Sequence, residues 1–189
     1  MVSILWTFWR ICTFKAGPDT VPASSFLLAL LLAVNAIVSI VVSVAITAAA
    51  VYVDPSLLEE NPNLSMDQAF TAGAFVNALT QVVVGQASVA GSVWLILNLM
   101  NFGNRFQRTL SAIFGVDLVI TLISGLLFFV TLFISPLLTS ITITALMFWS
   151  LTAIGFILHR ALQIHIGFGI ALSLFIVLFS IALSQAAVS

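Results

Sequence analysis

The sequence predicts an all-α fold: a polytopic membrane helical bundle of five transmembrane helices with an N-terminal interfacial amphipathic helix. Three observations predict this class: the scarcity of charge, the length of the apolar runs and the placement of the basic residues. Only 6% of the 189 residues are charged, whereas 62% are hydrophobic. A soluble domain carries about 25% charged residues, which keep its surface hydrated. The composition therefore excludes a soluble domain, a disordered chain and a nucleic-acid-binding protein.

The apolar runs are long enough to cross a membrane. Uncharged stretches cover residues 20–53, 68–104, 118–159 and 161–189. A spanning helix needs about 20 residues, and a backbone in lipid must satisfy its own hydrogen bonds, so these runs indicate helices. Ser135-Pro136 divides the third run, because proline cannot continue a helix. Within a membrane domain of residues 24–189, the predicted spans are about 24–52, 70–100, 109–134, 137–158 and 162–185.

The charges outside the spans predict how the chain is oriented. With five spans, all five basic residues fall on one side of the membrane, and the four acids of the loop at residues 54–69 fall on the other. Basic residues favour the cytoplasmic side. We therefore expect a cytoplasmic N-terminus and an external C-terminus. The basic residues are Arg10, Lys15, Arg105, Arg108 and Arg160.

We do not expect the N-terminal segment, residues 1–23, to be a span, because Arg10 and Lys15 interrupt its apolar residues. Leu5, Phe8, Trp9 and Cys12 have helical spacing. An aromatic, weakly basic helix of this kind suits the membrane interface. The alternative is an apolar tail without fixed structure. Because Cys12 is the single cysteine, the chain has no internal disulfide.

Small and polar residues recur at helical spacing along the spans. Span 1 carries Asn35, Ser39 and Ser43, each four positions apart, and span 2 carries Asn77 and Gln81. Helix packing is the first interpretation, because small residues let helices approach and polar ones bond across them. The alternative is a hydrated pathway, which Asn77 and Gln81 favour because amides need partners in lipid.

Asp117 is the one acid inside a span. It lies about 12 Å along the helix from the cytoplasmic end, and a carboxyl group at depth needs a partner. We expect it to face the bundle and to contact Asn98, Asn101, Arg160 or His165. Proton or ion handling is the alternative role. The candidate intramembrane polar site consists of Asp117, Asn77, Gln81, Asn98 and His165.

A second candidate site lies at the cytoplasmic ends of the spans. Arg105, Arg108, His159 and Arg160 form a basic group that suits an anionic lipid headgroup. His159 and His165 are six positions apart, on nearly opposite helix faces, so we expect no metal site. The sequence contains no recognisable catalytic triad, phosphate-binding loop or carboxylate pair. We therefore expect no enzymatic activity and no cofactor.

Three segments resemble the Yip-type domain family in its bacterial branch. They are GPDTVPASS before span 1, NRFQRTLSAIFGVDL at span 3, and MFWSLTAIGFILHRALQIHIGFGIAL across spans 4 and 5. The resemblance implies a five-span protein of the bacterial inner membrane, with a cytoplasmic N-terminus and a periplasmic C-terminus. The chain departs from the eukaryotic members, because it lacks their long N-terminal region and their acidic-aromatic motif. The resemblance therefore implies no binding of Rab-like GTPases and carries over no functional residue.

The function expected from these features is structural. We expect a scaffold, adaptor or accessory subunit that organises membrane proteins or lipids. Its partners would be the lipid bilayer and other membrane proteins or a second copy of the chain, as in a homodimer. The alternative is a small channel, transporter or lipid-translocating protein that uses a polar intramembrane groove with Asp117.

Overall fold

The structure is a computed structural model, and it describes residues 2–53 and 72–187. Six α-helices dominate the described residues, among which there is no strand. They are α1 (Val2–Cys12), α2 (Ser25–Val53), α5 (Ala72–Leu99), α6 (Phe106–Leu132), α7 (Pro136–Leu162) and α8 (Ile166–Ala186). Two short 3-10 turns, η1 (Pro18–Thr20) and η3 (Gly103–Arg105), precede α2 and α6. The all-α class is confirmed, and five helices are long and apolar enough to cross a membrane. The acidic loop expected at residues 54–69 lies outside the described residues.

The helix ends follow local sequence signals. The break at Ser135-Pro136 is confirmed: Ser135 is extended and Pro136 begins α7. The end of α7 differs from the prediction, because the helix continues to Leu162 instead of stopping near residue 158. His159 and Arg160 lie in its last turn, where positive charge interacts favourably with the unpaired carbonyl groups. His159 and Arg160 therefore belong to the helix and not to the loop after it.

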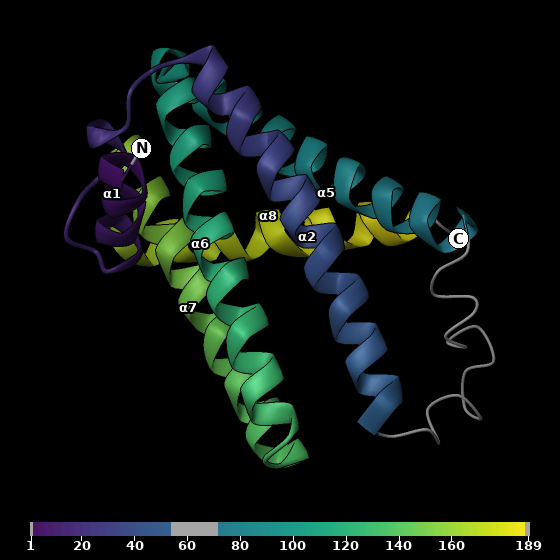
Figure 1. Cartoon of the computed structure of the whole chain (residues 1–189). Coiled ribbons are helices and arrows are strands. Elements are labelled where there is room, and N and C mark those ends of the chain that lie inside the picture. The colour runs from purple at the N-terminus through teal and green to yellow at the C-terminus, as the bar shows by residue number, and fades with distance from the viewer. Residues whose placement is uncertain (1, 54–71, 188–189) are drawn as a thin grey trace.

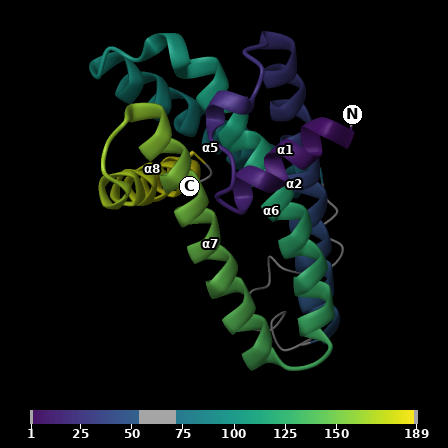
Figure 2. The same cartoon turned by 90° about the vertical axis from the view of Figure 1, so that its left-hand side faces the viewer.

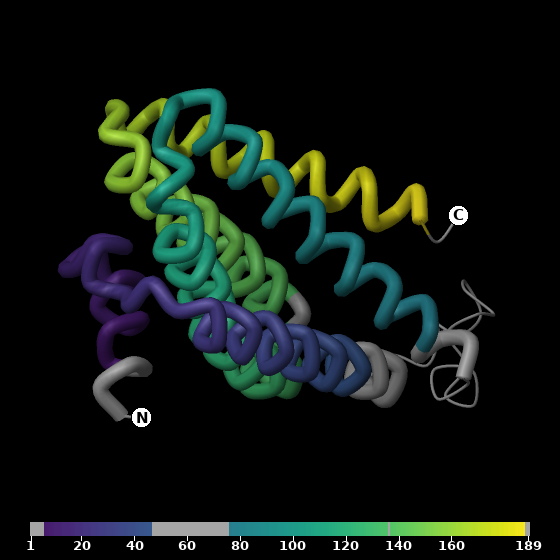
Figure 3. Tube along the Cα trace, turned by 90° about the horizontal axis from the view of Figure 1, so that it is seen from above, coloured from purple at the N-terminus to yellow at the C-terminus, as the bar shows by residue number. Residues whose placement is uncertain are grey.

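The five long helices form two groups. Figure 1 and Figure 3 show α2, α6 and α7 as one group and α5 with α8 as a second, side-by-side pair. The groups meet near the start of α6 and the end of α7, and they spread apart away from this junction. The most deeply buried apolar side chains come from α1, α5, α6, α7 and α8 and include Ile11, Val93, Val116, Leu158 and Ile176.

Two glycines allow α7 and α8 to cross closely. A Cβ atom on Gly169 would lie 2.4 Å from the carbonyl oxygen of Gly155, and a Cβ on Gly155 would lie 2.8 Å from the Cα of Ile170. Beside this crossing, the Ser173 hydroxyl donates to the carbonyl of Leu151 over 2.9 Å. Small residues let backbones approach where no hydrophobic effect drives association. This crossing attaches the α5/α8 pair to the other helices.

The predicted N-terminal helix is confirmed, and it packs against α6 and α7 (Figure 2). The Phe8 ring occupies the space over Gly115, where a Cβ atom would lie 2.2 Å from it. The indole nitrogen of Trp149 donates to the carbonyl of Cys12 over 3.0 Å. Trp9, expected on the apolar face, is exposed, because it lies about 100° around the helix from Phe8.

Candidate functional site

Asp117 lies in a polar cluster between α2 and α6. The Nδ2 of Asn35 donates to Oδ2 of Asp117 over 2.8 Å, and the hydroxyl of Ser39 donates to Oδ1 of Asn35 over 3.0 Å. Asn35 is only 1% exposed, so its amide is enclosed where the two helices meet. The cluster gives each buried polar group a partner, which lowers the cost of placing it among apolar side chains.

The partner of Asp117 differs from those expected. Asp117 does pair inside the bundle, but with Asn35 of α2. Within residues 2–53 and 72–187, it forms no hydrogen bond or ion pair with Asn98, Asn101, Arg160 or His165. The sequence signal was present, since Asn35 heads the polar stripe of span 1. The rotation of two helices about their axes decided which stripe met Asp117.

The remaining members of the expected polar site do not form one site. Asn77 and Gln81 are exposed on α5, and Asn98 follows Asn77 on the same helix at a distance of about 31 Å along the axis. His165 has a local role at the start of α8, where its Nδ1 accepts a hydrogen bond from the backbone of Gly167 over 3.2 Å. The five residues are therefore separate features.

The small residues of α5 and α8 serve helix packing. The hydroxyl of Ser180 donates to the carbonyl of Gly85 over 3.1 Å, and the hydroxyl of Ser88 donates to the same oxygen over 2.8 Å. The bond from Ser88 stays within α5, whereas the bond from Ser180 joins α8 to α5, because a helix carbonyl oxygen can accept a further hydrogen bond. The contact supports the packing interpretation of this part of the polar stripes.

The basic residues at the helix ends do gather. Arg105, His159 and Arg160 line one pocket with a volume of about 500 Å³, together with Asp19 and Gln163. Arg108, the fourth basic candidate, is exposed and does not line this pocket. Asp19 and Gln163 were not among the residues predicted for this site. Asp19 reaches the pocket through η1, and Gln163 does so because it follows α7 in a left-handed conformation, with φ of 58°.

Contacts with the protein hold three of these side chains in place. Nη1 of Arg105 donates to the carbonyl of Ala161 over 3.0 Å. The Arg160 guanidinium carbon lies 5.6 Å from the centre of the Phe156 ring, a cation–π distance. Nδ1 of His159 forms a hydrogen bond with the carbonyl of Ile164. The pocket is therefore an oriented set of polar groups.

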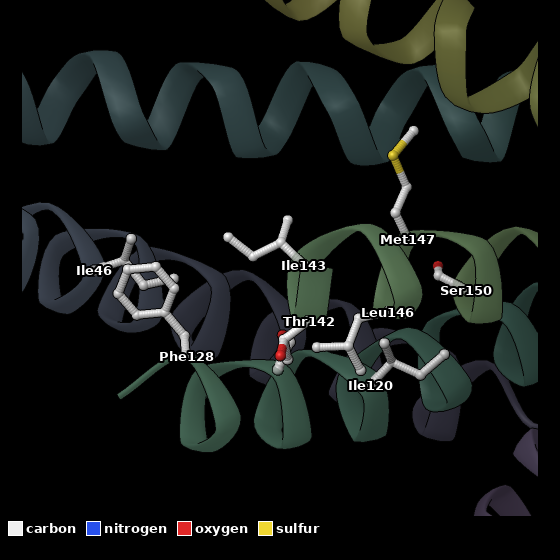
Figure 4. Close-up of a pocket in the computed structure, with 9 residues that line it drawn as sticks. Ile46, Ile120, Phe128, Thr142, Ile143, Leu146, Met147 and Ser150 are labelled. Atoms are coloured by element: carbon white, nitrogen blue, oxygen red, sulfur yellow. The ribbon is translucent and has the colours of Figure 1, made fainter. Parts of the chain in front are cut away.

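A second pocket, of about 320 Å³, is largely apolar and lies among α2, α6 and α7. Its lining residues are Ile46, Ile120, Ser124, Phe128, Thr142, Ile143, Leu146, Met147 and Ser150. Figure 4 shows the side chains of Ile143 and Met147 extending from α7 on the side nearer α5 in this view. Part of the α7 wall of this pocket therefore lies on the side nearer α5 in this view. Volumes of this size suit apolar ligands or side chains.

The described residues offer neither a reactive thiol nor a cluster of metal ligands. Burial raises the pKa of Cys12 to about 11, so its thiol is protonated and weakly nucleophilic near neutral pH. No group of three or more His, Cys, Asp or Glu side chains among the described residues is placed to hold a metal ion.

Comparisons with protein-family models, with curated proteins and with solved structures find no match to this chain. The Yip-type resemblance therefore stays an expectation from the sequence. The function is therefore inferred from the fold and from the pockets.

Proposed function

We propose that this chain is a non-enzymatic scaffold, adaptor or accessory subunit of a membrane, and that it holds an apolar segment of a partner membrane protein. The observation that carries the proposal is the apolar pocket among α2, α6 and α7, whose lining includes the exposed side chains of Ile143 and Met147. We also propose, from the sequence resemblance, that the membrane is the bacterial inner membrane.

The uneven burial of the helices supports a partner beside α2, which contributes Ile46 to the pocket. Inside the chain, 11% of the apolar segment of α2 and 11% of that of α5 is buried, against 44% for α6 and 39% for α7. The helices α2 and α5 are therefore the least covered by their own chain. A transmembrane segment of a partner would pack against them through the same close contacts that join helices in lipid.

The polar cluster at Asp117 gives the channel or transporter alternative no specific support. Its carboxylate is bonded to Asn35 where α2 and α6 touch, and it does not line the apolar pocket. Helix packing accounts for such a contact, because polar side chains bond across helices in a membrane. We therefore advance the adaptor role.

The adaptor role is tested by photo-crosslinking in native membranes. A photoreactive residue replaces Ile143, which lines the pocket and is 49% exposed. The matched control replaces Ile141, which is 57% exposed and lies about 200° around the same helix. We expect a discrete protein product from position 143 and none from position 141.

Two results would overturn the adaptor role. One is a product at position 143 that contains only lipid or only a second copy of the chain. The other is the same set of proteins at both positions, which would indicate random collisions in the membrane. As a further control, Ser150→Phe fills the pocket and is expected to abolish the product at position 143.

A further inference from the structure

The pocket lined by Asp19, Arg105 and Arg160 carries charges of both signs. Arg105 comes from η3, Arg160 from the last turn of α7, and Asp19 from η1. Three elements far apart in sequence thus bring two guanidinium groups and one carboxylate to a cavity of about 500 Å³. That volume lies within the usual range for small-ligand sites.

The two guanidinium groups are oriented but retain free donors. Arg105 uses one donor on the carbonyl of Ala161, and its guanidinium carbon lies 4.9 Å from the centre of the Phe102 ring. Arg160 stacks on Phe156 and forms no hydrogen bond within the described residues. Because a guanidinium has five N–H donors, both groups can still bind a phosphate. Arginine suits such binding because its planar fork matches the phosphate oxygens.

The carboxylate of Asp19 does not neutralise these cations. Asp19 is exposed and forms no ion pair with any cation in the part of the chain that the structure describes. Gly17 lies between the two charged side chains: a Cβ atom there would be 3.5 Å from Oδ2 of Asp19 and 3.8 Å from Cγ of Arg160. Positive and negative groups therefore border one cavity with a gap between them.

The position of the pocket along the helices matches the level of lipid headgroups. Arg105 lies near the start of the apolar segment Gly103–Leu132, and Arg160 lies near the end of the segment Leu137–Leu162. Each is within two positions of its helix end, or about 3 Å along the axis. Polar headgroups occupy this level, just outside the hydrocarbon core.

We propose that this pocket binds a zwitterionic lipid headgroup, a phosphate diester that carries a primary ammonium, as in phosphatidylethanolamine. The phosphate lies against Arg105 and Arg160, and the ammonium donates to the Asp19 carboxylate across the gap at Gly17. A choline headgroup cannot donate these hydrogen bonds, and a glycerol headgroup has no cation for Asp19. The basic residues alone suit any anionic headgroup. The Asp19 carboxylate restricts the expected ligand to a headgroup that carries both a negative and a positive charge.

The test measures lipid binding to the purified full chain by native mass spectrometry. Dioleoyl phosphatidylethanolamine, phosphatidylglycerol and phosphatidylcholine are added separately at equal concentrations. We expect the ethanolamine lipid to bind most tightly. Asp19→Asn should weaken its binding by about tenfold, as expected for one charge-assisted hydrogen bond, without weakening that of phosphatidylglycerol. Arg160→Gln should weaken both.

The control is Arg10→Gln, which removes an exposed cation of α1 that does not line the pocket. It should leave the order in which the three lipids bind unchanged. Lipid binding is compared only among variants that have the same melting temperature. The proposal is overturned if phosphatidylglycerol binds more tightly than the ethanolamine lipid, or if Asp19→Asn affects both equally. Soluble phosphoethanolamine distinguishes the source: binding of that compound without any preference among lipids would overturn the lipid assignment.

Discussion

At the scale of single residues, the contact between Asn35 and Asp117 has the largest consequences. Both groups lie between apolar helices. The amide of Asn35 donates a hydrogen bond, and the carboxyl group of Asp117 accepts it. Removing one member leaves the other without a partner, which costs more than a neutral exchange of both. The chemistry of the pair therefore separates a packing role from an ionic one.

We expect Asp117→Asn to retain the fold, because the new amide oxygen can still accept from Asn35. Asn35→Ala should lower the free energy of unfolding by about 1–3 kcal/mol, since it leaves the carboxyl group without its donor. Thermal denaturation in detergent measures both effects. A loss of stability in Asp117→Asn as large as that in Asn35→Ala would contradict this account.

Cys12 reports whether α1 is docked. Because burial raises its pKa to about 11, we expect slow labelling by a maleimide at pH 8 and fast labelling after unfolding in detergent. The labelling rate should rise as the pH approaches 11, since the thiolate is the nucleophile.

Gly115→Leu should speed the labelling of Cys12, because its side chain takes the space of the Phe8 ring. Gly91→Leu is the control, since a Cβ atom there meets nothing within 4 Å. Equal labelling rates in the two variants would show that the contact between Phe8 and Gly115 does not hold α1 in place.

At the scale of helices, the crossing of α7 and α8 brings two backbones into close contact. Gly169→Ala places a methyl group 2.4 Å from a backbone oxygen, which a side-chain rotation cannot relieve. We expect a loss of about 1–3 kcal/mol, the usual cost of overpacking. Gly85→Ala is the matched control, because its Cβ would meet only the Ser180 hydroxyl at 3.5 Å. A melting curve followed by tryptophan fluorescence distinguishes them, and equal curves would contradict the close crossing.

The existence of the helices was predictable because it depends on local signals. Pro136 marked the start of α7, and long apolar runs marked the five spanning helices. The end of α7 was less predictable, because a basic residue such as Arg160 occurs both in loops and in the last turn of a helix, where it interacts favourably with the unpaired carbonyl groups. Which face of α1 is buried was only partly predictable, since Phe8 and Cys12 pack inward while Trp9 does not.

At the scale of the whole molecule, the structure gathers Arg105, His159 and Arg160 at one pocket, on the side that we expect to be cytoplasmic. Alkaline phosphatase, which is active only outside the cytoplasm, tests this orientation. Fused after Ala187 it should be active, and fused after Gln163, in the turn between α7 and α8, it should be inactive. The reverse pattern would invert the topology and place the basic pocket on the external face.

The candidate sites were predictable only in part. Three of the four basic residues meet because Arg105 directly precedes α6, whereas His159 and Arg160 lie in the last turn of α7. Asp19 joins them through the turn at η1, and no pattern in the sequence marks that approach. The residues of the expected polar site do not meet. Asn77 and Asn98, for example, lie on one helix, about 31 Å apart along its axis.

The sequence by itself determined the membrane class and the five long apolar helices, because these depend on composition and on periodicity within each segment. The tertiary structure alone decided that Asn35 meets Asp117 from 82 positions away, that Asp19 shares a pocket with two arginines, and that the two helix groups spread apart. These features depend on how each helix is rotated and where it crosses its neighbours. Close contacts such as that of Gly155 with Gly169 set those angles, and they form only when the helices pack.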